Sequence, residues 1–160
     1  KHHPYSTGNS ELDGLIKNIL DKAPSSENAD QLREMMITAI KLAEDGMERG
    51  DVRMMNSSMK ELRYALKVFY PFRHIRKVAL FGSARTPKLS ADYRLARDFS
   101  KKIVKAGWMV ITGASTGIMN AGNEGAGRAG SFGVNIRLPF EQEANPVIAN
   151  DRKLINFKLI

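Results

Sequence analysis

Apolar residues recur at three- and four-residue steps through most of the first half of the chain, which is the pattern of amphipathic helices. The spacing predicts helices at about residues 11–23, 28–49 and 51–70. Gly50 is expected to end the second of them, because glycine is the common stop signal of a helix. We therefore expect a helical region over residues 1–74 that carries little chemistry of its own.

The pattern changes at about residue 75, where short apolar runs alternate with helical stretches. Strands are predicted at residues 77–81, 108–112 and 132–138, with helices at 92–106 and 117–129 between them. This alternation implies parallel strands joined by right-handed crossovers. The predicted fold class is α/β: a Rossmann-like doubly wound parallel sheet in residues 75–160, preceded by an α-helical N-terminal region in residues 1–74.

Composition excludes several kinds of site and location. The 160 residues include no cysteine, so disulfides, thiolate metal sites and a cysteine nucleophile are excluded. The 3 histidines do not form a ligand set, so we expect neither a metal nor another cofactor. No apolar run reaches the roughly 20 residues of a membrane span, and no signal-peptide pattern is visible. We therefore expect a cytoplasmic protein with no membrane partner.

The net charge of +8 is carried by the second half of the chain. Residues 1–75 hold 11 basic and 11 acidic residues, whereas residues 76–160 hold 14 and 6. A basic domain favours anionic partners such as nucleotides, nucleic acid or phosphorylated metabolites; the alternative is a solvated basic surface. Aromatic residues are not interleaved with the basic ones as single-strand platforms require, so nucleic acid is the less favoured partner.

Two glycine-bearing connections follow the first two predicted strands. In the first, Gly82 permits close backbone approach, Ser83 offers a hydroxyl, and Arg85 offers a planar cation suited to phosphate. In the second, small residues expose backbone amides at the start of a helix, where anions are favoured. Its candidate binding residues are Gly113, Ser115, Thr116, Gly117, Ile118 and Met119. A tight turn without a ligand is the alternative for each connection.

A third connection, after the predicted strand at residues 132–138, is expected to reach the same edge, because ligands bind beyond the carboxyl ends of parallel strands. Glu141 and Gln142 are placed there to bond a ribose or a base, and a carboxylate at that point would also polarise water. A solvated glutamate with no ligand is the alternative.

Several short motifs occur in one order along this half of the chain. They are Phe81 to Arg85, Thr112 to Ala121, Gly125-Ala126, Asn135-Ile136, Leu138-Pro139, Glu141-Gln142 and Asn145-Pro146. Together they resemble the Lonely Guy (LOG) family, long labelled "possible lysine decarboxylase", and specifically its longer bacterial branch with an extra helical N-terminal region. The resemblance covers about residues 75–158.

The resemblance implies a Rossmann-like fold, a homodimer or higher homo-oligomer, and hydrolysis of the N-glycosidic bond of nucleoside 5′-monophosphates. The substrates would be AMP or cytokinin-type ribotides, and the products a base and ribose 5-phosphate. It also implies site roles for residues of this chain: Gly82 and Ser83 line the nucleotide pocket, Gly113, Gly117, Ile118 and Met119 lie beneath the nucleoside, and Glu141 contacts the sugar or base. Ser115, Thr116 and Asn120 depart from the family's usual residues.

The family's second signature, Pro-Gly-Gly-x-Gly-Thr-x-x-Glu preceded by an Arg-Lys pair on a helix, does not occur in these 160 residues. In that family the signature cradles the phosphate and supplies the catalytic carboxylate, so no catalytic residue is assigned in this chain. We expect the helix that would carry Arg-Lys to begin near Asn156. The favoured interpretation is that the chain belongs to a longer phosphoribohydrolase. The alternatives are a short nucleotide-binding or sensing module without hydrolysis and, third, a nucleic-acid-binding domain.

Overall fold

The computed structural model describes residues 5–24, 27–136 and 144–158. The chain divides into two compact units, Lys1–Met55 and Asn56–Ile160, and the boundary falls within helix α3 (Arg49–Phe69). The change from helical to α/β sequence comes later, at about residue 75. The domain assignment of 1–74 and 75–160 stays a prediction about the organisation of the sequence.

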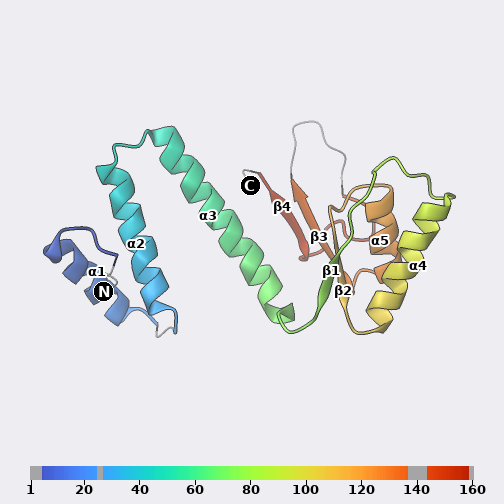
Figure 1. Cartoon of the computed structure of the whole chain (residues 1–160), viewed down its shortest axis with the longest axis horizontal. Coiled ribbons are helices and arrows are strands. Elements are labelled where there is room, and N and C mark those ends of the chain that lie inside the picture. The colour runs from blue at the N-terminus through green and yellow to red at the C-terminus, as the bar shows by residue number, and fades with distance from the viewer. Residues whose placement is uncertain (1–4, 25–26, 137–143, 159–160) are drawn as a thin grey trace. The chain divides into compact units, whose positions relative to one another are not determined.

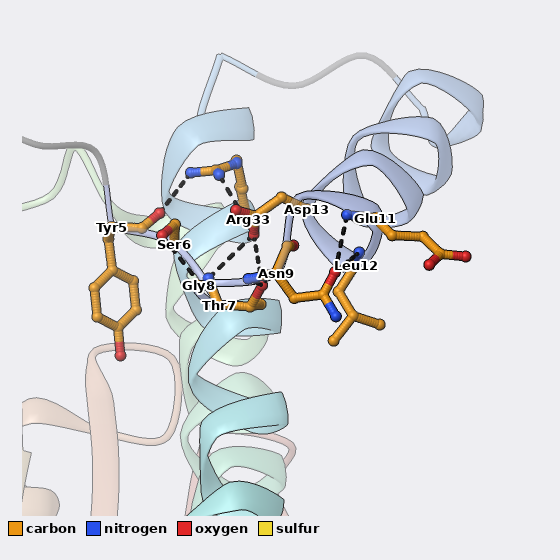
Figure 2. Close-up of polar contacts among 9 residues, drawn as sticks. All are labelled: Tyr5, Ser6, Thr7, Gly8, Asn9, Glu11, Leu12, Asp13 and Arg33. Atoms are coloured by element: carbon orange, nitrogen blue, oxygen red, sulfur yellow. Dashed lines mark hydrogen bonds and ion pairs between the residues drawn. The ribbon is translucent and has the colours of Figure 1, made fainter.

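The first unit holds α1 (Ser10–Lys22), α2 (Ala29–Glu44) and the start of α3. One polar cluster ties the segment before α1 to both helices, as Figure 2 shows. The backbone amide and the hydroxyl of Thr7 both donate to Asp13 Oδ1 at 3.1 Å. Arg33 of α2 donates to the carbonyl oxygen of Tyr5 at 2.7 Å, and its other terminal nitrogen lies 3.8 Å from Asp13 Oδ1.

The predicted end of the second helix is wrong by five residues. α2 ends at Glu44 instead of Arg49, because the chain turns through Gly46, whose φ of 67° lies in the left-handed region that glycine readily adopts. Gly50, which was expected to end this helix, lies in the first turn of α3 instead. Glycine at the start of a helix is tolerated, so its presence alone did not mark an end.

The second unit is built on a parallel sheet of β1 (Lys77–Ala79), β2 (Met109–Thr112), β3 (Ser131–Ile136) and β4 (Leu154–Phe157). The strand order is β1-β2-β3-β4 and every described pair is parallel. Helices α4 (Ala91–Lys105) and α5 (Ile118–Ala126) lie side by side against the sheet (Figure 1). The α/β class with a helical N-terminal region is confirmed, and the arrangement is Rossmann-like.

Strand β4 corrects the prediction of a helix near Asn156. Leu154 to Phe157 pair in parallel with Gly133 to Ile136 of β3, and Ile155 is 1% exposed. Four residues are too few for hydrophobic spacing to distinguish a strand from a helical turn. The pairing with β3 decides the outcome, because a helix there would leave the edge of β3 without backbone partners.

Two adjacent residues of β3, Ser131 and Phe132, point to opposite faces of the sheet. The hydroxyl of Ser131 donates to the carbonyl oxygen of Gly127 at 2.7 Å, at the end of α5. Successive strand residues point to opposite faces, so Phe132 lies on the other face. There its ring stacks on Phe69 with a centroid distance of 4.5 Å and meets the edge of Phe72 at 5.3 Å. Phe72 belongs to the 3-10 helix η1 (Tyr70–Phe72), which follows α3.

Candidate functional site

The connections after β1 and β2 meet at the carboxyl edge of the sheet. The amide of Ile118, the first residue of α5, donates to the carbonyl oxygen of Ser83 at 3.0 Å. The hydroxyl of Thr116 donates to the carbonyl oxygen of Ala84 at 2.8 Å. These two hydrogen bonds join loops that are more than thirty residues apart in the sequence, so the structure brings both groups of candidate residues together.

The contact between the two loops leaves no room for a side chain at Gly82 or Gly117. A Cβ atom at Gly82 would lie 2.6 Å from the side chain of Ile118, and one at Gly117 would overlap the carbonyl oxygen of Ser83. Gly117 also has a φ of 60°, which L side chains rarely adopt. A Cβ atom at Gly113 would lie 2.8 Å from the sulfur of Met119. Gly82 and Gly117 thus allow the two loops to touch each other, a role that the sequence did not reveal, whereas Gly113 makes room for Met119 of its own segment.

The joined loops present polar groups to solvent. Gly82, Ser83, Arg85 and Thr116 are exposed, whereas Gly117 is buried in the contact. The candidates Gly113, Ser115, Ile118 and Met119 are half-buried. The hydroxyl oxygen of Ser83 accepts a hydrogen bond from the backbone amide of Arg85 at 3.1 Å. This bond closes a small turn that keeps Arg85 next to Ser83. Glu141 lies outside the described residues, so its predicted place at this edge stays a prediction.

A buried network of three polar side chains supports the second loop from below. Thr112, at the end of β2, donates its hydroxyl to Asn123 Oδ1 at 2.7 Å and accepts the amide of Ala114 at 3.0 Å. Asn145 donates to the same Asn123 oxygen at 2.9 Å. The sequence marks Asn145 only as part of a family motif. No sequence pattern marked Asn123 as part of a buried network, because whether one polar residue on a helix is buried depends on what packs against that helix.

A second polar network lies between α4 and α5. Tyr93, which is 2% exposed, donates its hydroxyl to Glu124 Oε2 at 2.7 Å and accepts Asn120 Nδ2 at 2.7 Å. Burial, followed by the hydrogen bond to Glu124, raises the pKa of Tyr93 to about 12. The phenol is therefore a neutral donor at physiological pH. It fixes the side chain of Asn120 in the first turns of α5, close in sequence to the loop that precedes that helix.

Four buried side-chain atoms have no partner among the described residues: Ser100 Oγ, Asn120 Oδ1, Asn123 Nδ2 and Asn145 Oδ1. Three of the four belong to the asparagines of the two networks. Buried polar groups are nearly always hydrogen-bonded in folded proteins, to water or to a ligand where protein atoms are lacking.

Other features bear on which partners and cofactors the chain could bind. No three histidine, cysteine, aspartate or glutamate side chains group as a metal site would need within residues 5–24, 27–136 and 144–158. Among the described helices, none is both long and apolar enough to cross a membrane. The expectations of no cofactor and of a cytoplasmic location stay predictions.

The parallel sheet and the loops joined at its carboxyl edge define a Rossmann-like α/β domain, the class in which ligands bind at that edge. Residues 75–154 match the SLOG cluster4 family, and the chain belongs to that family. The SLOG superfamily is related to LOG-type Rossmann-like proteins, and membership indicates a nucleotide-related function. The comparison with curated proteins found no match.

Proposed function

We propose that this protein binds a nucleoside 5′-monophosphate at the joined loops after β1 and β2. The observation that carries the proposal is the contact of Ser83 with Ile118, which joins the two candidate loops at the edge of the sheet where ligands of this fold class bind. Arg85 supplies a cation suited to the phosphate. The first turn of α5 adds the partial positive charge of a helix N-terminus.

The proposed reaction is hydrolysis of the N-glycosidic bond, which releases the base and ribose 5-phosphate. Cleavage of this bond develops oxocarbenium character at the ribose, so a carboxylate is needed to stabilise that charge or to activate water. The resemblance to LOG proteins supports this reaction and implies that Glu141 contacts the sugar or the base. The role of the loops is to hold the phosphate, so that binding energy positions the sugar for attack.

Two measurements test the proposal. Calorimetry with AMP and with adenosine reports binding, and we expect adenosine to bind at least tenfold more weakly because it lacks the phosphate. Chromatography of an overnight incubation with AMP reports release of adenine. Release supports the hydrolase, whereas binding without release supports a non-catalytic nucleotide-binding module. If AMP does not bind, or if adenosine binds as tightly as AMP, the phosphate site is wrong.

We also propose that the chain forms a homodimer. β1 lies at an edge of the described sheet, and Ala79 and Phe81 at and just after it are exposed, Phe81 to 86%. Unpaired sheet edges are commonly covered by another element or chain. Light scattering at micromolar concentration checks the mass, and a monomer contradicts the proposal. Affinity for oligonucleotides that falls steeply with salt would favour the nucleic-acid alternative instead.

A further inference from the structure

Asn145 is fixed against the backbone of the second loop by several hydrogen bonds. Its side-chain nitrogen donates to the carbonyl oxygens of Ala114 at 3.0 Å and Ser115 at 3.1 Å, and its backbone amide donates to the Ala114 oxygen at 2.7 Å. Asn145 is 3% exposed, and its contacts with the loop span about thirty residues of sequence. A buried side chain with these contacts ties the loop to the segment that follows β3.

The orientation of this amide is determined by its neighbours. Asn123 Oδ1 accepts from Asn145 Nδ2 and from the hydroxyl of Thr112, and Thr112 in turn accepts the amide of Ala114. Asn123 is fully buried, so it cannot exchange these partners for water. The Asn145 nitrogen therefore faces three oxygens, to which the two N–H groups of an amide donate with one of them shared, whereas a carboxylate has no proton to donate.

The peptide planes of the loop turn the corresponding amides the other way. In a planar trans peptide the N–H points opposite to the preceding carbonyl. Because the carbonyls of Ala114 and Ser115 face Asn145, the amides of Ser115 and Thr116 face away from it. Neither amide donates to any other described residue. Ala114 has a φ of 62°, a conformation that residues other than glycine rarely adopt and that persists only when neighbours hold it.

We propose that Asn145 is a positioning residue that turns the amides of Ser115 and Thr116 outward to bind the phosphate of the nucleotide. The inference rests on the proposed function, because it specifies how that site recognises an anion. Asn145 acts by holding the carbonyls on the inner side of the loop and does not touch the ligand itself. Adjacent backbone amides that point the same way before a helix N-terminus can bind one phosphate together.

The Asn145→Asp variant tests this role with almost no change in shape. Its carboxylate would face the oxygens of Ala114, Ser115 and Asn123, so we expect the Kd for AMP to rise at least tenfold at pH 7.5. At pH 5 a protonated carboxyl can donate again, so the ratio of variant to wild-type Kd should fall. Asn156→Asp, an exposed asparagine of β4, is the control with the same change in charge and should stay within twofold of the wild-type Kd.

Circular dichroism must show that each variant is folded at the temperature of the binding measurement. An unchanged Kd in folded Asn145→Asp, or a ratio that does not change with pH, overturns the inference and leaves the proposed function standing. A wild-type NMR titration with AMP is the second measurement, which is needed if the variant fails to fold. The Ser115 and Thr116 amide resonances must shift as AMP binds, and unmoved resonances overturn the inference. If the wild-type chain does not bind AMP, the proposed function fails and this inference fails with it.

Discussion

The amide of Ile118 donates to the carbonyl oxygen of Ser83 at 3.0 Å, and the side chain of Ile118 fills the space in front of Gly82. One residue thus joins the start of α5 to the loop after β1 through both its backbone and its side chain. The contact explains why two loops that are distant in the sequence act as one surface. It also shows where a small change in volume would separate them.

The Gly117→Ala variant should separate the two loops. The added methyl group would overlap the carbonyl oxygen of Ser83, in addition to the strain of a positive φ. Gly127→Ala is the matched control, because Gly127 also has a positive φ, of 69°, but has no atom within 4 Å of the added methyl group. We expect the free energy of unfolding, measured in urea, to fall by about 1 kcal/mol or more in both variants because of backbone strain. Only Gly117→Ala should also weaken AMP binding at least tenfold, and equal binding by the two variants would contradict the prediction.

Arg85→Ala should reduce the affinity for AMP about tenfold or more, because a charge-assisted hydrogen bond to phosphate contributes roughly 1.5–3 kcal/mol. The folded stability should not change, since the Arg85 side chain is exposed. Arg152→Ala is the control: it removes the same charge at another exposed position of the same unit. Calorimetry at two salt concentrations measures both variants. An equal loss of affinity would show that overall charge, and not the position of Arg85, determines binding.

Tyr93 should make folding stability depend on pH in the alkaline range. Its folded pKa of about 12 lies above the usual value of about 10, so its contribution is complete below pH 10. That contribution should be lost as the pH rises from 10 to 12, because the unfolded state then releases its proton first. Urea unfolding at pH 8, 10.5 and 11.5 measures the decline, which should be smaller in Tyr93→Phe. Tyr64→Phe, at a tyrosine that is 52% exposed, should decline like the wild type.

Asp151 should stabilise the fold at neutral pH and lose that effect in acid. Burial alone raises its pKa, but hydrogen bonds from the side chain and amide of Lys153, with the charges of Lys153 and Arg128, hold the pKa below its ordinary value. The stabilisation is complete above the unfolded pKa of about 3.9 and is lost as the pH falls through the lower folded pKa.

The variant Asp151→Asn leaves the ammonium group of Lys153, which is only 9% exposed, without its carboxylate. We expect a loss of about 3 kcal/mol at pH 7, as for other broken buried ion pairs, and a smaller difference from the wild type near pH 3. Asp98→Asn, which breaks the exposed pair with Arg97, should cost less than about 1 kcal/mol. Equal losses in the two variants at pH 7 would contradict the prediction.

The sequence by itself determined the elements with a strong local pattern. The helical spacing before residue 70 and the alternation of strands and helices after residue 75 were sufficient to predict the α/β class, and α1, α3 and α4 lie where the spacing placed them. Local sequence signals gave wrong predictions where either of two glycines, Gly46 and Gly50, could end the same helix. They also failed where the element was as short as β4. In each case the contacts that stabilise the observed structure involve residues outside a window of a few positions.

For the candidate site, too, the sequence predicted one part and only the structure revealed the other. Glycines and small polar residues after two strands marked the loops, because parallel strands end at a common edge whatever their side chains are. Only the tertiary structure decided what those residues do: Gly82 and Gly117 make room for the other loop, and Asn145 and Asn123 hold the loop from within. A hydrogen bond across thirty residues depends on how the helices pack on the sheet, and that packing is a property of the whole domain and not of any one segment.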